Sequence, residues 1–367
     1  MKVLVFGGTG AIGESVVKLL VEHGHDVYVT SRTKRDSKQN QLNYIHGNAM
    51  DLKFVKSILD INSYDVLIDF MTYTTEEFLQ RYEYLLSHVE RLFYFSSSRV
   101  YANHGKKQIV ETSSRLLDIC TDEDYLTTDE YALQKARQED ILFGANRKNW
   151  TIIRPYITYN TERMQLGVLE KEEWLYRALH GRTIVFTKDI ADKITSLTYG
   201  MDAAERIVKL IEKCEHISEG KIYHIATEEQ ITWSDVFDIY VEVLTDILGK
   251  PQKYKMLSNS VQYAKYNRFW QIKYDRLYDR IFDSSKIQTV TGNMEFTHTK
   301  EGLKKVLSEF LQGERNFRIH DINWFSQGFF DKVCHERTPL REISGNKNKV
   351  KYLLARYTNI QEFRKQK

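Results

Sequence analysis

The sequence predicts an α/β protein with a doubly wound parallel sheet, a smaller C-terminal domain and an additional helical tail. Three observations support this prediction. Over the first 155 residues, short runs rich in Val, Ile, Phe and Tyr alternate with amphipathic helical patterns, which is typical of strands joined by helices in βαβ units. A glycine-rich segment follows the first of these runs, and the alternation becomes irregular after Pro155.

The alternating elements can be placed along the chain by their apolar periodicity. We expect strands at 2–6, 26–30, 42–46, 65–70, 91–96 and 150–154. We expect helices at 11–23, 50–59, 76–87 and 128–143, a further strand at 221–226, and a long helix at 233–248. This order predicts a first domain at 1–160 with a returning strand near 221–227, a second domain at 161–316, and a helical extension at 317–367.

Composition excludes several classes of protein. The chain has 367 residues, a net charge of +3, 42% apolar and 28% charged residues, and only 3 Pro, so a disordered or low-complexity protein is excluded. No apolar run approaches the roughly 20 residues of a membrane span, and the N-terminus lacks the pattern of a signal peptide. The three cysteines lie far apart, and the histidines show no metal-ligand spacing. We therefore expect a cytoplasmic protein without a bound metal.

The glycine-rich segment directly after the first strand predicts a dinucleotide site. Glycines at 7, 10 and 13 would allow a tight turn, a close approach of the backbone to a pyrophosphate, and close packing of helix on strand. The free N–H groups at the start of the following helix would face the pyrophosphate. We expect Gly7, Thr9, Gly10, Ile12 and Gly13 to bind the cofactor.

The end of the second strand indicates which dinucleotide is bound. NAD sites usually carry Asp or Glu at this point to bond the ribose 2′-hydroxyl. Here the chain reads Ser31-Arg32-Thr33-Lys34-Arg35, with a hydroxyl and three cations and no carboxylate. Because a guanidinium suits a 2′-phosphate, Ser31 and Arg32 predict NADP in preference to NAD.

A tyrosine and a lysine are spaced for joint chemistry on one helix. Tyr131 and Lys135 are four residues apart, so they share a face of the helix expected at 128–143. A phenol is a poor base at neutral pH, and a neighbouring ammonium favours its ionised form. The serines at 96–98 end the fifth strand, where side chains of a parallel sheet project into the ligand cleft.

At these residues the chain resembles the short-chain dehydrogenase/reductase superfamily, specifically its extended branch of nucleotide-sugar epimerases, dehydratases and reductases. The resemblance covers about residues 1–310 and implies a Rossmann sheet with a substrate-binding second domain. It implies that Tyr131 transfers the proton and that Lys135 holds the cofactor and the phenolate. The pattern Ser-x-x-Val-Tyr places the catalytic serine, which bonds the reacting oxygen, at Ser97, with Ser98 as the alternative register.

The resemblance also narrows the expected reaction. Dehydratases of this branch carry an acidic pair where this chain has Ser98 and Arg99, which disfavours elimination. We expect an NADP(H)-dependent epimerase or keto-sugar reductase of carbohydrate biosynthesis that acts on a nucleotide sugar, with Ser98 and Arg177 as substrate contacts and a homodimer as the assembly.

Two alternatives stay open. The end of the fourth strand, Ile68–Tyr73, resembles a divergent group that includes non-catalytic RNA-associated proteins, so a nucleotide- or RNA-binding scaffold is one alternative. A reductase of a small carbonyl compound is the other. The expected Ser97, Tyr131 and Lys135 and the absence of a basic patch on the body argue against nucleic acid as a partner.

The tail differs in charge from the rest of the chain. Residues 341–367 contain eight Lys or Arg and two Glu, a net charge of +6, which leaves 1–340 at −3. Ile322, Phe325, Phe329 and Val333 form one apolar helical stripe, and Val350, Leu353, Leu354 and Tyr357 form another. Either these helices pack on the body or across a dimer, or the segment 341–367 docks to an acidic partner or a membrane surface.

Overall fold

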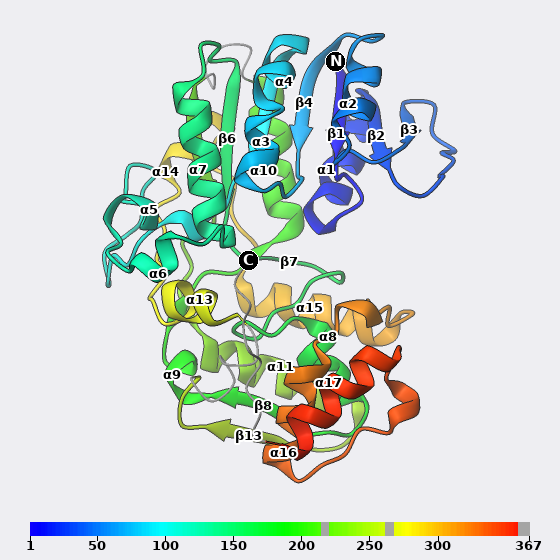
Figure 1. Cartoon of the computed structure of the whole chain (residues 1–367), viewed down its shortest axis with the longest axis vertical. Helices are drawn as coiled ribbons and strands as arrows, with labels where there is room; N and C mark the ends of the chain where they lie inside the picture. The colour runs from blue at the N-terminus through cyan, green and yellow to red at the C-terminus, as the bar shows by residue number, and fades with distance from the viewer. Residues whose placement is uncertain (214–219, 261–267, 359–367) are drawn as a thin grey trace.

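A single parallel sheet organises the first half of the molecule. The structure is a computed structural model that describes residues 1–213, 220–260 and 268–358. Seven parallel strands are ordered β11-β6-β5-β4-β1-β2-β3 (Figure 1). Their bounds are β1 Lys2–Phe6, β2 Asp26–Ser31, β3 Leu42–His46, β4 Tyr64–Asp69, β5 Val89–Phe95, β6 Trp150–Pro155 and β11 Lys221–Ile225. The order departs from β1 in both directions, which confirms the predicted doubly wound fold.

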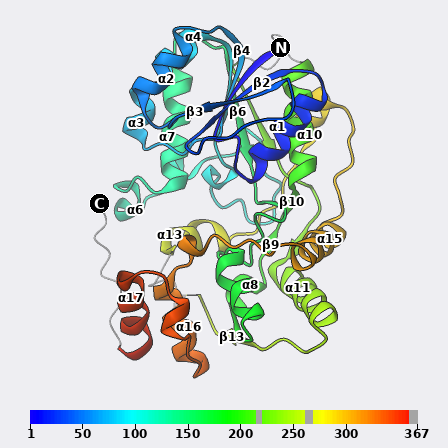
Figure 2. The ribbon, with the colours of Figure 1, turned by 90° about the vertical axis from the view of Figure 1, so that its right-hand side faces the viewer.

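Helices cover both faces of this sheet. Helices α1 and α10 lie on one face, and α2, α3, α4 and α7 lie on the other (Figure 2). The helices that pack on the sheet are α1 Ala11–Glu22, α2 Leu52–Leu59, α3 Thr75–Leu79, α4 Tyr82–His88, α7 Tyr131–Gly144, α10 Gly200–Lys213 and α14 Ser285–Thr291. Because α10, α14 and β11 all return to the sheet, the segment 161–316 contributes to both parts of the molecule.

One of the predicted helices is divided in two. The single helix expected at 76–87 is wrong, because α3 ends at Leu79 and α4 begins at Tyr82. Arg81 stands at the break with its side chain buried. Its guanidinium donates to the carbonyl oxygens of Ala49 and Met50 at 3.1 and 3.0 Å. These hydrogen bonds hold the chain in the turn between the two helices.

The second half of the chain builds a lower part beneath the carboxyl ends of the strands (Figure 1). Strands β8 Ile184–Thr187 and β13 Tyr254–Leu257 pair in parallel. Two pairs of two-residue strands accompany them: β7 Thr158–Tyr159 with β10 Thr198–Tyr199 in parallel, and β9 Ile194–Thr195 with β12 Ile231–Thr232 antiparallel. The helices here are α8 Lys171–Leu179, α9 Lys188–Ala191, α11 Trp233–Leu248, α13 Phe269–Gln271, α15 Thr299–Gln312, α16 Trp324–Cys334 and α17 Asn346–Tyr357. Short helices α5 Leu116–Ile119 and α6 Glu123–Leu126 lie in the loop after β5. No helix in the described ranges has both the length and the apolar character of a membrane span.

The described part of the tail packs on the lower part of the molecule. Ile322, Phe325 and Phe329 of the first predicted stripe are buried. The second stripe is wrong, because Val350 and Tyr357 are more than half exposed while Tyr352 and Ala355 face inward. That face of α17 packs closely on α16 at Gly328. A Cβ on Gly328 would lie 2.4 Å from the Tyr352 carbonyl oxygen, so only glycine allows this approach.

A buried ion pair joins α7 to the centre of the sheet. Glu139 is fully buried and accepts from Arg154 Nε and Nη2 of β6, both at 2.7 Å. It also accepts from Ser96 Oγ at 2.6 Å and from Arg115 Nη1 at 3.2 Å. Four charged or polar donors therefore converge on one carboxylate, and they fix the rotation of α7 about its axis.

Replacing this carboxylate tests the role of the buried pair. We expect Glu139→Gln to lower the free energy of unfolding by about 3 kcal/mol, because the guanidinium of Arg154 stays buried without a counter-charge. Asp140→Asn is the matched control, since Asp140 also accepts from Arg115 but is largely exposed, and it is expected to cost less than about 1 kcal/mol. Urea denaturation of both variants measures the difference; equal losses would contradict this role.

Candidate active site

The glycine-rich loop forms a close-packed entry to α1. Gly7 has a φ of +73°, a conformation that favours glycine. A Cβ on Gly13 would lie 2.8 Å from the Gly8 Cα, so helix and loop approach as the sequence predicted. Gly10 stands at the N-cap of α1 without a capping side chain, and its predecessor Thr9 belongs to the same turn. The N–H groups of the first turn therefore face the space in front of the loop.

A cavity of about 340 Å³ lies where the strands β4, β5 and β6 end. Ile12 of α1 lines it, together with residues of the lower part of the molecule such as Arg163 and Arg276. Its walls combine apolar and charged side chains. The lining residues are Ile12, Phe70, Thr72, Phe95, Ser96, Ser97, Arg99, Tyr131, Lys135, Pro155, Tyr156, Ile157, Thr158, Arg163, Gln165, Glu170, Gln271 and Arg276.

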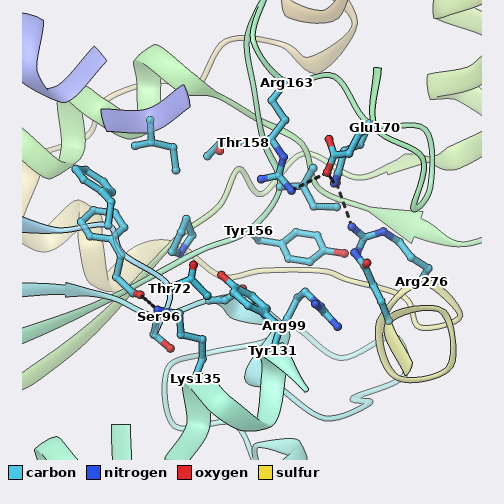
Figure 3. A pocket seen from close by; sticks show the side chains of 18 residues that line it. Thr72, Ser96, Arg99, Tyr131, Lys135, Tyr156, Thr158, Arg163, Glu170 and Arg276 are labelled. Atoms are coloured by element: carbon cyan, nitrogen blue, oxygen red, sulfur yellow. Dashed lines mark hydrogen bonds and ion pairs between the residues drawn. The ribbon is translucent and has the colours of Figure 1, made fainter. Parts of the chain in front are cut away.

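Tyr131 and Lys135 reach this cavity together from the first turns of α7 (Figure 3). The helix begins at Tyr131 because Glu130 caps it, with its side chain accepting from Ala132 N at 2.9 Å. Lys135 is buried, and its Nζ donates to the Phe95 and Met71 carbonyl oxygens at 2.8 and 3.2 Å. Burial lowers the pKa of the Lys135 amine to about 8.

The structure separates the two candidate serines. Ser97 lines the cavity, and its Oγ accepts from the Arg99 N–H at 3.2 Å. Ser98 does not line it: its side chain is fully buried and donates to the Arg154 carbonyl oxygen at 2.8 Å. Ser98 as a substrate contact is therefore wrong, because a short 3₁₀ turn begins at this residue and directs its hydroxyl toward β6.

Arg177 is also placed elsewhere than expected. It is fully buried in α8, where Nη1 lies 2.8 Å from Asp331 Oδ1 and Nη2 lies 2.9 Å from Glu336 Oε2. Its Nε donates to the Thr183 carbonyl oxygen at 2.9 Å. Arg177 as a substrate contact is wrong, because the guanidinium instead joins α8 to α16 and the turn that follows it.

The cavity carries charged residues that sequence reasoning did not assign to it. Arg163 Nη2 lies 3.4 Å from Glu170 Oε1, both on the wall opposite Tyr131 (Figure 3). Arg99 stands beside Tyr131, with its Cζ 5.3 Å from the ring centre. Arg276 is buried and donates to Gln165 Oε1 at 3.1 Å. None of these residues lies in a periodic motif, and only Arg99 is adjacent to one.

One carboxylate serves three of the guanidinium groups around the cavity. Asp275 is buried, and it pairs with Arg276, with Arg280 Nε at 3.0 Å, and with Arg99 Nε at 3.7 Å. Glu130 Oε1 supplies a second partner to Arg99 at 2.6 Å. The buried Arg276 and Arg280 and the partly buried Arg99 thus share two carboxylates. Burial lowers the pKa of Arg276 to about 10, which is consistent with incomplete compensation of this charge.

The segment after β2 presents an exposed basic edge beside the glycine loop. Ser31 is buried at the end of β2, and its Oγ donates to the Thr33 carbonyl oxygen at 2.7 Å. Arg32 and Arg35 are exposed, and the Arg35 guanidinium lies 6.0 Å from the Tyr44 ring centre. The Arg32 carbonyl oxygen is in hydrogen-bond contact with His46 Nε2 at 3.2 Å. The Arg32 side chain is therefore exposed directly after β2, where the sequence predicts a contact to the cofactor.

A family model and a curated relative both match more than half of this chain. The family model described as the NAD dependent epimerase/dehydratase family matches residues 3–226. The chloroplast stem-loop binding protein of 41 kDa b from Arabidopsis thaliana is 26% identical over 249 residues, which are 63% of this chain and 60% of that protein. The chain thus spans about three fifths of the length of this curated relative.

Solved structures share the fold at low identity. The UDP-glucose 4-epimerase of Bifidobacterium longum, in complex with NAD+ and UDP, superposes with a TM-score of 0.64 at 18% identity, over 86% of this chain and 99% of that one. The dTDP-glucose 4,6-dehydratase of Bacillus anthracis, in complex with NAD, gives a TM-score of 0.65 at 15% identity, over 87% and 99%. These likenesses show a common fold.

Arg177 of α8 and Arg163 of the cavity wall are expected to differ in how much each contributes to stability. We expect Arg177→Met to lower the free energy of unfolding by about 3 kcal/mol, because Asp331 loses its buried counter-charge. Arg163→Met removes a partly exposed ion pair and is expected to cost about 1 kcal/mol or less. Urea denaturation measures both. A stable Arg177→Met variant would show that the buried pair does not hold α8 to α16.

Proposed function

Because the chain belongs to the NAD dependent epimerase/dehydratase family, we propose that it is an NADP(H)-dependent epimerase or keto-sugar reductase that acts on a nucleotide-activated sugar. The observation that carries this proposal is the convergence of Ser97, Tyr131 and Lys135 on one cavity bordered by Ile12 at the start of α1. The cavity thus brings together a group that could transfer a proton, a loop that could bind a cofactor and cationic side chains that could bind a substrate.

The glycine loop supports a dinucleotide. Its close packing at Gly7 and Gly13 leaves the backbone, without side chains, facing the expected pyrophosphate, and the first-turn N–H groups of α1 would donate to it. Arg32 would contact the 2′-phosphate that distinguishes NADP from NAD. When bound, the cofactor supplies the hydride acceptor or donor at its nicotinamide ring.

Residues of α7 and of the segment after β5 would transfer the proton and bond the reacting oxygen. In an epimerase, Tyr131 as phenolate removes the proton of a substrate hydroxyl while the carbon that bears it loses hydride, and a keto sugar results. Return of hydride to the opposite face, with the proton returned by Tyr131, inverts that carbon. In a reductase, Tyr131 instead protonates a carbonyl oxygen as its carbon gains hydride. Ser97 would bond this oxygen, and the Lys135 ammonium would stabilise the phenolate.

The charge of the cavity supports an anionic substrate. Four lining side chains are cationic, namely Arg99, Lys135, Arg163 and Arg276, and Glu170 is the one carboxylate among the described lining residues. Arg99, Arg276 and the neighbouring Arg280 share the carboxylates of Asp275 and Glu130, so one positive charge among these three guanidinium groups is left for an anion to offset. The diphosphate of a sugar nucleotide is such an anion, and guanidinium groups bind phosphate oxygens bidentately.

The positions that follow Ser97 bear on the reaction type. Ser98 points away from the cavity, and Arg99 presents a cation beside Tyr131. Neither residue is a carboxylate that could abstract a proton from carbon. This arrangement favours oxidation and reduction at a hydroxyl-bearing carbon over elimination of water.

A second candidate function is supported by one relative. The protein from Arabidopsis thaliana that matches 249 residues is named as a stem-loop binding protein, so a nucleotide- or RNA-binding scaffold is the competing proposal. The two functions differ in what they require of Tyr131, because a scaffold needs no proton-transferring phenol in the cavity.

Removal of the Tyr131 hydroxyl separates these functions. A panel of nucleotide sugars is first screened for a rise in melting temperature with NADP+, and turnover is then measured on those that bind. We expect Tyr131→Phe to lower kcat by at least about a hundredfold, because the proton-transferring group is lost. Tyr64→Phe is the matched control, since its hydroxyl is buried away from the cavity. Full turnover by a folded Tyr131→Phe protein would refute this mechanism, and stabilisation by stem-loop RNA alone would favour the scaffold.

The cofactor preference is tested at Arg32. We expect Arg32→Glu to weaken NADP+ binding about tenfold or more, because a carboxylate replaces a phosphate-binding cation, while NAD+ affinity is retained. Lys38→Glu makes the same change of charge in the same exposed loop and is expected to alter neither affinity by more than about twofold. Calorimetric titration gives the four constants. Equal or tighter binding of NAD+ by the unaltered protein would overturn the NADP preference.

A further inference from the structure

A buried carboxylate stands directly behind the cavity at the end of β4. Asp69 is fully buried, and its Oδ1 accepts from the Met71 N–H at 2.9 Å and from the Tyr73 hydroxyl at 3.2 Å. Its Oδ2 has no hydrogen-bond partner among the described residues. A carboxylate with an unpartnered oxygen is costly to bury, so its presence needs a reason beyond the turn that it caps.

The loop that Asp69 holds is joined to Lys135 in a closed ring of hydrogen bonds. The Lys135 ammonium donates to the Met71 carbonyl oxygen at 3.2 Å and to the Tyr94 hydroxyl at 3.0 Å. The Tyr94 hydroxyl donates to Gln138 Oε1, and Gln138 Nε2 donates to the Tyr73 carbonyl oxygen at 2.7 Å. Since Met71 and Tyr73 both bond Asp69, the ring returns to this carboxylate.

The hydrogen-bond acceptors of Lys135 are neutral, and the nearby carboxylate of Asp69 supplies a negative charge. The three acceptors of its Nζ are two carbonyl oxygens and a phenol. Two carboxylates, Asp69 and Glu139, favour the ammonium form. Glu139 lies on the same helix, and its oxygens already accept from Arg154 and Arg115. Asp69 is therefore the carboxylate that is free to compensate the ammonium.

The other charged neighbours of Asp69 do not remove this role. The Arg81 guanidinium lies 4.1 Å from the Tyr73 ring centre and lowers the pKa of Asp69, but each of its three nitrogens donates to a carbonyl oxygen, those of Glu77, Ala49 and Met50. Burial raises the pKa of Asp69 to about 6, and burial lowers that of Lys135 to about 8. Between these values both groups are charged.

We propose that Asp69 is a positioning residue for Lys135: its negative charge keeps the buried amine protonated at neutral pH, and its hydrogen bonds fix the loop whose carbonyl oxygen receives that ammonium. The consequence for turnover rests on the proposed function, because that is where Lys135 stabilises the Tyr131 phenolate. The charge coupling itself is a property of the folded chain and is measurable without any substrate.

The coupling is tested by titrating Lys135 in the full-length protein. Lysine carrying ¹³C at Cε is incorporated, and the Lys135 resonance is identified as the one missing from Lys135→Met. We expect it to titrate near pH 8 in the unaltered protein. In Asp69→Asn the midpoint is expected to fall by about one pH unit or more, because loss of a nearby negative charge disfavours the ammonium.

A matched variant separates charge from structure. Tyr73→Phe removes one hydrogen bond to Asp69 while it keeps the carboxylate, so its Lys135 midpoint is expected to stay within about 0.3 pH unit of the unaltered protein. Asp69→Ser is the second uncharged variant, used if the amide does not fold, and it should show the same fall as Asp69→Asn. An unchanged midpoint in either folded, uncharged variant would overturn the proposal, as would an equal fall in Tyr73→Phe.

Turnover provides the functional readout. On a nucleotide sugar accepted by the unaltered enzyme, we expect the alkaline limit of kcat in Asp69→Asn to move to lower pH by the same amount as the Lys135 midpoint. A fall in kcat with an unmoved limit would show a structural role only and would contradict the proposal. If no nucleotide sugar is turned over, the proposed function fails, while the midpoint still decides whether Asp69 and Lys135 are coupled.

Discussion

The buried ion pair between Glu139 and Arg154 is the interaction on which the geometry of the site depends. It joins the middle of α7 to β6 with two hydrogen bonds of 2.7 Å. Lys135 lies one turn before Glu139 on the same face of the helix, so a rotation of α7 that broke the pair would also withdraw the ammonium from the cavity. Ser96 bonds the same carboxylate, which ties the end of β5 to the same reference point.

Charge networks of a similar kind hold the lower part of the molecule. Asp275 forms ion pairs with Arg276 and Arg280 beside the cavity, and Asp331 forms one with Arg177 where α8 meets α16. Buried pairs add little net stability, but removal of one partner is costly. Such contacts therefore specify one arrangement of helices. In this protein that arrangement positions Arg163 and Arg276 in the wall of the cavity. The tail belongs to this framework, because Tyr352 of α17 donates to Asp331 at 2.7 Å.

The sequence anticipated features that depend on neighbours along the chain and missed those that depend on distant contacts. The strands, the glycine loop and the four-residue spacing of Tyr131 and Lys135 follow from local periodicity, and the predicted strands agree with the structure to within two residues. Ser98 and Arg177 were assigned from motif position and residue type. Their partners, Arg154 and Asp331, lie 56 and 154 residues away, so nothing local indicated that both side chains turn inward.

The amino-acid sequence by itself determined the doubly wound sheet, the place of the glycine turn and the shared helical face of Tyr131 and Lys135, because each follows from repeats of two to four residues or from the conformational freedom of glycine. The tertiary structure alone decided which cations reach the cavity and which carboxylate stands behind Lys135. Lys135 meets Met71 across 64 residues, and Arg276 meets Gln165 across 111. Such contacts exist only once the sheet and the lower part have packed. Burial then strengthens the interactions between their charges and shifts their pKa values.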